Sequence, residues 1–355
     1  MKLIVKKQAF ENALVSLQPF LERKDFSHIT SHIYMTATQD SLILKASDNE
    51  IGLSVKITDF ILEEEGSTTC NGKKLLDIIR IVKQDDIIFN SSESLLHIKQ
   101  GRSNYKLPTF DPNEFPEFPK SNNLPKVEIN SLKLINAFKK AMPSVDTNNP
   151  KFELNGALID IKDNQISIVS TDTKRLALIK LPHELTQTLS LIIPKKAISE
   201  IQKLFFNELE IYFDNTNFII MNENYHFFTK VINGKFPDYA RIIPKEIQYN
   251  LTLSKETFIS TIKQVNIFSN EIKMTFNQGG ILFESMNDEN FEAKTELEID
   301  SVFDKDFTIA VNSRYIIDFL SGIETKEFVM GFNEPNTPFQ LNSDNFTTII
   351  MPIAL

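Results

Sequence analysis

The sequence has few of the residues from which disulfides, metal sites and nucleophilic centres are built. Cys70 is the only cysteine among 355 residues, so the chain can form neither an internal disulfide nor a cysteine-based zinc cluster. The five histidines show no HxH or HExxH spacing. We therefore interpret Cys70 as a buried small hydrophobe, and we expect no metal and no cofactor.

Long apolar runs are also missing. No stretch is long enough to cross a bilayer, and the N-terminal "MKLIVKKQAF" breaks off its apolar run after three residues, too early for the h-region of a signal peptide. We therefore expect a cytoplasmic protein that makes no membrane contact.

Motifs for catalysis are equally scarce. "CNGKKLL" lacks the GxxxxGK[ST] spacing of a phosphate-binding loop, and no GxSxG is present. Asp172 beside Arg175, with His226 elsewhere, could be imagined as an acid-base site, but an Asp in a hairpin turn more often accepts bonds from nearby backbone N–H groups. The residues give no support for an enzyme.

The sequence contains three copies of one pattern of strands and helices, and an internal repeat of this length indicates the domain organisation. "LIVKKQAFENAL", "VEINSLKLINAF" and "NLTLSKETFIST" each read as a short alternating strand followed by a helical pattern. The strands end at Val5, Ile129 and Leu253, which lie 124 residues apart in both steps.

Each copy continues with a hairpin and a second helix. The hairpins are predicted in "LILKASDNEIGLSV", "ISIVSTDTKRLALI" and "ILFESMNDENFEAK", with Asp48, Asp172 and Asn287 in the turns. The second helices begin in "CNGKKLLDIIRIV", "IIPKKAISEIQKLF" and "AVNSRYIIDFLSGI", where Pro194 suits a first-turn position and Asn312 an N-cap.

Two proline-rich connectors separate the copies. "FPEFPK" follows the first and "FPDYARIIPK" the second, and their prolines exclude the middle of a central strand. We expect ordered connections with side chains on show. The fold class is therefore α+β, with three tandem units over residues 1–121, 122–245 and 246–355, each with two helices packed on antiparallel sheets.

Positive charge is concentrated in the helices although the chain carries a net charge of −9. The helical patterns over 72–84 and 130–145 each carry a net +3, and the one over 194–205 carries +2. Basic residues seven apart share a helix face: Lys73 with Arg80, Lys133 with Lys140, and Lys196 with Lys203. The opposite faces are apolar and should pack on the sheets; we assign to them Ile78/Ile81/Val82, Leu134/Phe138/Ala141 and Ile198/Ile201/Phe205.

The whole chain resembles the bacterial sliding clamp, the beta subunit of DNA polymerase III. The resemblance rests on "LNGALIDI", on "STDTKRLAL", on "GKFPDYARIIP" and on the C-terminal "MPIAL", which are similar to the family's LNG, TDGHRL, FPDYRR and MPMRL segments in order and spacing. It implies a head-to-tail homodimer that closes a ring of six domains around duplex DNA, with the helices facing the hole. No base-reading motif is needed for such sequence-independent binding.

The resemblance also implies which residues act. A cleft for the short linear motif of the replicative polymerase catalytic subunit, the clamp loader and other replication and repair proteins would be formed by Leu154, Thr171, Lys174, Arg175, Leu176, Pro237, Arg241, Ile242, Ile349, Met351, Pro352 and Ile353. In that cleft, Arg175 and Arg241 would orient peptide carbonyls or a carboxylate.

DNA contacts are implied for two loops in addition to the basic helix faces. These loop residues are Arg23 and Lys24, and Asn148 and Lys151. The dimer would pair edge strands of the first and third domains, with Tyr105 and Leu107 on one side and Ile267 and Phe268 on the other.

The sequence departs from the family pattern in its turn and at its cleft. Thr173 replaces a Gly, so the turn cannot use the free access of Gly to positive φ. Lys174, Ala240 and Ala354 replace a His and two Arg, which would change the rim of the cleft and its peptide preference. A non-DNA scaffold built on the same triplicated domain remains the alternative function.

Overall fold

The computed structural model describes residues 1–22, 25, 28–83, 85–127, 129–182, 188–286, 292–299 and 306–354. These residues form two compact units, one of residues 1–132 and 200–231 and the other of residues 133–199 and 232–355. All paired strands within them are antiparallel. None of the helices in the described ranges has the length and hydropathy that a bilayer crossing requires.

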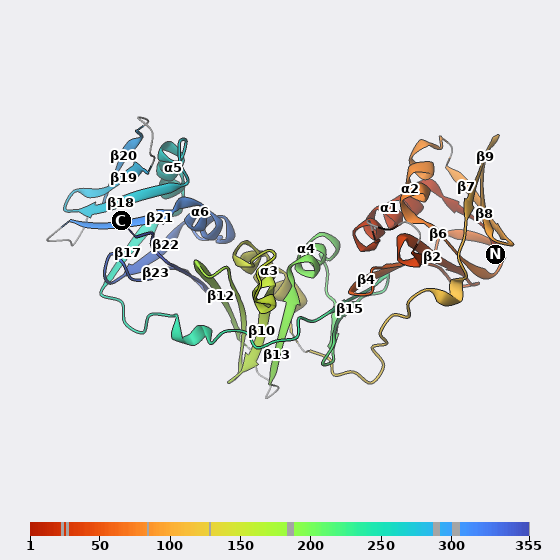
Figure 1. Cartoon of the computed structure of the whole chain (residues 1–355), viewed down its shortest axis with the longest axis horizontal. Coiled ribbons are helices and arrows are strands. Elements are labelled where there is room, and N and C mark those ends of the chain that lie inside the picture. The colour runs from red at the N-terminus through yellow and green to blue at the C-terminus, as the bar shows by residue number, and fades with distance from the viewer. Residues whose placement is uncertain are drawn as a thin grey trace. The chain divides into compact units, whose positions relative to one another are not determined.

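The first unit holds two sheets. A five-stranded sheet has the order β5 (Phe60–Glu64), β1 (Lys2–Lys6), β7 (Asp86–Ser92), β8 (Leu95–Gln100) and β9 (Ser103–Pro108). A seven-stranded sheet has the order β14 (Glu210–Phe213), β15 (Asn217–Met221), β16 (Tyr225–Lys230), β4 (Ile51–Ile57), β3 (Leu42–Ser47), β2 (His32–Ala37) and β6 (Gly66–Asn71). Helices α1 (Lys7–Leu17) and α2 (Gly72–Ile81) pack on each other and on these strands (Figure 1).

The second unit repeats this arrangement. Its eight-stranded sheet has the order β13 (Leu189–Pro194), β10 (Gly156–Lys162), β11 (Gln165–Thr171), β12 (Arg175–Pro182), β24 (Phe346–Ile350), β23 (Phe339–Ser343), β22 (Glu327–Phe332) and β17 (Tyr249–Ser254). A four-stranded sheet has the order β20 (Lys294–Glu298), β19 (Gly280–Ser285), β18 (Glu271–Asn277) and β21 (Phe307–Asn312). Helix α5 (Lys255–Val265) packs on β19 and β20, and α6 (Ser313–Gly322) on α5 and β21.

The remaining helices, α3 (Ser131–Ala141) and α4 (Lys195–Leu204), belong to the middle third of the chain. All six helices thus begin within a residue or two of the predicted positions, and the predicted N-cap is confirmed, since the Asn312 side chain accepts a bond from Arg314 N at 3.0 Å. Pro194, expected in a first turn, is instead the last residue of β13, directly before α4.

The three alternating strands are not equal. Those ending near Val5 and Leu253 are β1 and β17. In the middle copy, where Glu128 lies outside the described residues, the pairing seen is a bridge between Lys126 and Tyr212, with bonds from Val127 N to Ile211 O and from Phe213 N to Pro125 O. Pro125 has no N–H and can only accept in this pairing. The hairpins of the first two copies are confirmed as β3–β4 and β11–β12, whereas Asn287 lies outside the described residues.

The buried face of α2 corrects one prediction. The helix buries Leu75, Leu76 and Ile79, with Val82 just after it, while Ile81 is 64% exposed and Ile78 only half-buried. Lys73, Asp77 and Arg80 lie on the side of the helix opposite Leu75 and Ile79, whereas Ile81 shares its side with Lys74 and Asp77. The helical period therefore favours the face that packs, and assigning Ile81 to it was wrong. The faces predicted for α3 and α4 are confirmed, since Leu134, Phe138, Ala141, Ile198, Ile201 and Phe205 are all buried.

Candidate functional site

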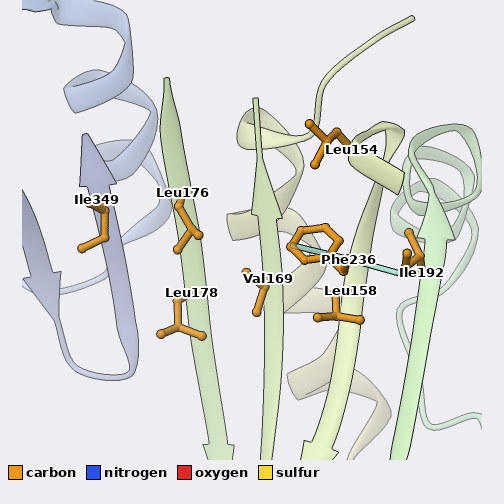
Figure 2. Packing of buried hydrophobic residues seen from close by; sticks show 8 residues of the cluster. All are labelled: Leu154, Leu158, Val169, Leu176, Leu178, Ile192, Phe236 and Ile349. Carbon is orange, nitrogen blue, oxygen red and sulfur yellow. The ribbon is translucent and has the colours of Figure 1, made fainter. Parts of the chain in front are cut away.

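An apolar cluster in the second unit gathers several predicted cleft residues. Leu176 on β12 lies directly opposite Ile349 on β24, and both belong to a cluster that includes Leu154 and Phe236. Figure 2 shows the Phe236 ring between Leu154 and Leu158, in front of the strands. The connector was expected to keep its side chains on show, but Phe236 is buried because it anchors the connector to this cluster.

A second anchor fixes the connector to the same sheet. Tyr239 donates its hydroxyl to Asp160 Oδ2 at 2.7 Å, and Lys162 Nζ lies 5.3 Å from the centre of the Tyr239 ring. Burial raises the pKa of the Tyr239 hydroxyl, and the bond to Asp160 raises it further. The phenol therefore stays protonated and holds Pro237 beside the cluster, while Arg241 and Ile242 remain exposed at its rim.

The C-terminal segment passes beside the turn of the β11–β12 hairpin. Met351 N donates to Lys174 O at 2.8 Å, and Ile353 N donates to Ala310 O at 2.8 Å. These bonds hold Met351, Pro352 and Ile353 against a hollow of about 450 Å³, while the Met351 side chain stays 40% exposed. The hollow is also lined by residues that were not assigned to the cleft from the sequence, Glu271, Asn312 and Tyr315.

Arg175 occupies a different place from the one expected of a peptide-binding side chain. Its guanidinium donates to Asp172 Oδ2 at 3.0 Å, to Asp318 Oδ2 at 2.6 Å and to the carbonyl oxygen of Pro143, and the residue is only 8% exposed. The guanidinium carbon also lies 4.4 Å from the centre of the Tyr315 ring. Arg175 therefore ties β12 to α6 beneath the hollow.

The β11–β12 turn is strained at Thr173, the residue that replaces the family's Gly. Thr173 adopts φ 72°, in the left-handed region that a β-branched residue rarely enters. Asp172 Oδ1 accepts from the backbone N–H groups of Lys174 and Arg175, and Thr171 Oγ1 accepts from Thr173 N at 3.1 Å. These three bonds hold the turn without a glycine and leave Lys174 exposed.

In the first unit, the region equivalent to the apolar cluster around Leu176 is filled by side chains of the chain itself. Gly52, which pairs with Phe228, takes the position of Leu176, which pairs with Ile349. A Cβ at Gly52 would lie 2.4 Å from Phe228 and 2.9 Å from the ring of Phe118, which comes from the first connector. In the second unit, where β12 pairs with β24, the larger Leu176 occupies the matching position.

The basic residues lie on their helices as predicted. Lys73, Arg80, Lys133, Lys196 and Lys203 are exposed, and Lys140 is half-buried with its Nζ 5.8 Å from the centre of the Phe346 ring. Lys203 Nζ pairs with Glu200 Oε1 at 2.8 Å, and Arg80 Nε lies 3.8 Å from Glu11 Oε1.

The loop residues predicted to contact DNA divide into two groups. Asn148, with φ 62°, and Lys151 are exposed. Arg23 and Lys24 lie outside the described residues.

The residues predicted for self-association lie on an edge strand of the first unit and after a helix of the second. Tyr105 and Leu107 belong to β9, the last strand of the five-stranded sheet, where Leu107 is already buried by its own unit. Ile267 and Phe268 follow α5 and are 71% and 47% exposed.

Comparison with known proteins places these features in one family. Models of the DNA polymerase III beta subunit match residues 1–119 with the N-terminal domain, 128–238 with the central domain and 240–354 with the C-terminal domain. A beta sliding clamp of Helicobacter pylori is 41% identical over 374 residues and covers all of both chains.

Solved structures agree with the sequence comparison. The crystal structure of the Helicobacter pylori beta clamp bound to a DNA ligase peptide superposes with a TM-score of 0.94 at 40% identity over the whole of both chains. A DNA polymerase sliding clamp from Bacillus subtilis, 19% identical, shares the fold with a TM-score of 0.93, covering 100% of this chain and 99% of that one.

Proposed function

Because this chain belongs to the family of bacterial sliding clamps, the beta subunit of DNA polymerase III, we propose that two copies close head to tail into a ring around duplex DNA. The chain is a DNA sliding clamp, a non-catalytic protein that tethers its partners to DNA. The observation that carries this function is the match of all three family domains, in order, along the whole chain.

A ring explains how an acidic protein works on a polyanion. With a net charge of −9 the chain is not expected to bind DNA tightly from the side, because phosphate affinity is supplied by Lys and Arg. The exposed basic residues of α2, α3 and α4 would make many weak contacts that do not depend on base sequence. We propose that Arg23, Lys24, Asn148 and Lys151 add to these contacts.

Partners would bind at the apolar cluster and the adjoining hollow of the second unit. The ligase peptide bound by the Helicobacter pylori clamp supports a short peptide as the ligand. Ile242 and Met351 offer exposed apolar surface, and Leu154, Leu176 and Ile349 form the buried cluster beside it. Arg241, whose side chain is 86% exposed, is a cation at the rim. We propose that the polymerase catalytic subunit, the clamp loader and repair proteins share this surface, which includes Thr171, Lys174, Pro237, Pro352 and Ile353.

Arg175 has a supporting role in this proposal. Its guanidinium is engaged by Asp172, Asp318 and the Pro143 carbonyl, so it would position the β11–β12 turn rather than bind the peptide. Asn312 and Tyr315, which the sequence did not assign to the cleft, would extend the peptide site along the hollow.

The organisation of the chain follows from the same premise. We propose domain boundaries at 1–121, 122–245 and 246–355; each of the two larger sheets then contains strands from two neighbouring domains. We also propose that the protein acts in the cytoplasm, without a cofactor.

Reversing charge on the helix faces separates the clamp from a non-DNA scaffold. We expect Lys73→Glu, Lys133→Glu and Lys196→Glu together to reduce the yield of clamp loaded on nicked circular DNA or to shorten its lifetime there. The mass of the variant, measured by light scattering, should remain that of the parent. Three reversals at exposed basic residues away from these faces, Lys56→Glu, Lys99→Glu and Lys245→Glu, serve as the matched control. An equal loss in both variants, or no loss in either, would favour the scaffold.

A further inference from the structure

The hollow beside the C-terminal segment carries opposite charges at its two ends. Lys174 lies in the β11–β12 turn and Glu271 is the first residue of β18; both residues are exposed and line the hollow. Residues 351–353 run between the two ends, because Met351 N donates to Lys174 O and Ile353 N donates to Ala310 O on β21. A ligand that lies along this segment would therefore meet a cation at one end and a carboxylate at the other.

Strand pairing determines which end carries the carboxylate. Glu271 pairs with Asn312 where β18 lies beside β21, and Ala310 is two residues earlier on β21. Asn312 also lines the hollow and caps α6. Glu271 is thus held on the side of the hollow that β18 and β21 form, whereas Lys174 is held on the side of the β11–β12 turn.

Neither of these two charges is neutralised by an ion pair. Within the ranges that the structure describes, Lys174 and Glu271 take part in no ion pair. Lys273 Nζ, on the same face of β18 as Glu271, instead lies 3.7 Å from Glu284 Oε2. The Glu271 carboxylate is therefore available to a cation of a ligand, and the Lys174 ammonium group is available to an anion.

The charges beneath the hollow are already paired with one another. The Arg175 guanidinium donates to Asp172 and Asp318, and the Tyr315 ring, which lines the hollow, has its centre 4.4 Å from the guanidinium carbon. A ligand carboxylate would have to displace these contacts to reach Arg175. Among the described residues that line the hollow, Lys174 is the only cation and Glu271 the only carboxylate.

Two departures from the family pattern contribute to this charge distribution. Lys174 stands where the family has a His, so the turn carries a full positive charge at neutral pH. Ala354 stands where the family has an Arg, so the C-terminal side of the hollow lacks the cation that would offset Glu271. The positive end of this hollow therefore lies at the turn rather than at the C-terminal segment.

We propose that the hollow selects partner peptides by charge at two places, taking an acidic side chain next to Lys174 and a basic side chain next to Glu271. This inference rests on the proposed peptide-binding function and specifies which peptides the site prefers. Between the two charges, the peptide would place apolar side chains against Met351 and Ile353. A peptide with the opposite order of charges would bring like charges together at both ends and bind more weakly.

The exposure of both ends sets the size of the effect. Because Lys174 and Glu271 are open to solvent, the two charge pairs would contribute selectivity more than affinity. Reversing one charge of the peptide converts an attraction into a repulsion, and we expect a change of about 3- to 10-fold in the dissociation constant at low salt. At about 1 M salt, where the Debye length is about 3 Å, the difference should fall below about twofold.

A charge scan of a peptide tests the proposal with the full chain. The probe is the DNA ligase peptide bound by the Helicobacter pylori clamp, labelled at its N-terminus and amidated at its C-terminus so that only side chains carry charge. Each position in turn is changed to Glu and, separately, to Lys, and fluorescence anisotropy gives the affinity of each peptide. We expect one position at which Glu binds about 3- to 10-fold more tightly than Lys, and a second position at which Lys binds more tightly by a similar factor.

Charge reversals in the protein assign these two peptide positions. Lys174→Glu should reverse the preference at the first position and leave the second unchanged, and Glu271→Lys should do the opposite. Glu334→Lys makes the same charge change at an exposed residue between β22 and β23, outside the hollow, and should alter neither preference. Because all three residues are exposed, the thermal unfolding of these variants should match that of the parent.

The outcomes separate the charge preference from the peptide site itself. If the peptide binds but neither Lys174→Glu nor Glu271→Lys switches a preference, the proposal is wrong and the peptide site stands. A switch that also occurs in Glu334→Lys would overturn the proposal too, because the total charge of the chain would then explain it. If the peptide does not bind the parent chain, or binds it as tightly after Met351→Ala, the proposed peptide-binding function is contradicted instead.

Discussion

At the scale of single residues, His32 shows how burial sets a protonation state. Its ring packs 4.3 Å from the Phe110 ring and lies 3.3 Å from Thr69 Oγ1, and burial lowers its pKa to about 4. The folded state therefore holds the neutral imidazole, while the unfolded chain binds a proton near pH 6.5.

We expect stability to fall as the pH drops from about 6.5 to about 4, because in that window the unfolded state binds more protons. The contribution of His32 should reach about 2–3 kcal/mol at the acid end. The unfolding free energy is measured in urea at each pH for the parent and for His32→Phe. The difference between the two pH profiles gives the contribution of His32, since all other titratable groups are shared. Parallel profiles between pH 6.5 and 4 would contradict the assignment.

Residues of the peptide surface provide a second test at this scale. Met351 is partly exposed beside the hollow and Leu176 is buried in the cluster, so Met351→Ala removes contact with little damage to the core. We expect Met351→Ala to weaken binding of a DNA ligase peptide about 5- to 10-fold, and Leu176→Ala with Met351→Ala to weaken it further.

Fluorescence anisotropy with a labelled peptide measures this change. Ile61→Ala, at an exposed isoleucine of β5, is the control and should leave the affinity unchanged. Equal affinities for all variants would remove the cluster and the hollow from the peptide site.

At the scale of elements, local pattern predicted most of the helices and hairpins because the apolar period of each segment is read without tertiary context. The helical period also places the apolar face of α2 at Leu75, Leu76 and Ile79, so the assignment of Ile78 and Ile81 to that face did not follow from the pattern. The pattern could not indicate that Lys126 forms only an isolated bridge with Tyr212, because that pairing depends on a strand distant in the sequence.

The candidate site was predictable in its chain segments but not in its geometry. Resemblance located Leu176, Ile349 and Met351, yet Tyr315 and Glu271 come from α6 and β18, far along the chain from the β11–β12 turn. Arg175 was expected to be available to a ligand, and only the fold reveals Asp318 as its partner. A signal for this pair would have required co-variation between distant positions.

The Arg175 tie between β12 and α6 yields a prediction at the element scale. Arg175→Ala leaves the carboxylates of Asp172 and Asp318, both largely buried, without their cation, and we expect a loss of about 2–4 kcal/mol in unfolding free energy. The control is Arg314→Ala, at an exposed position of α6, the helix that carries Asp318. This variant should lose less than about 0.5 kcal/mol in unfolding free energy. Denaturant unfolding compares the two, and similar losses would show that Arg175 has no special structural role.

At the scale of the whole molecule, the repeat supports the proposed self-association. Two junctions are completed within the chain by β4–β16 and β12–β24, and β9 and β20 are among the strands that end a sheet. A closed ring of two copies would hold DNA by topology rather than by affinity, which suits a protein of net charge −9.

The most direct test of this account is retention on nicked circular DNA after loading with the matching clamp loader and ATP. The circle is then cut once with a restriction enzyme, and gel filtration is repeated. We predict that the protein co-elutes with the circle and is lost from the linear form. Equal retention on both forms would mean that ordinary affinity holds the protein, and binding to neither form, with a loader shown to be active on another clamp, would contradict the clamp function.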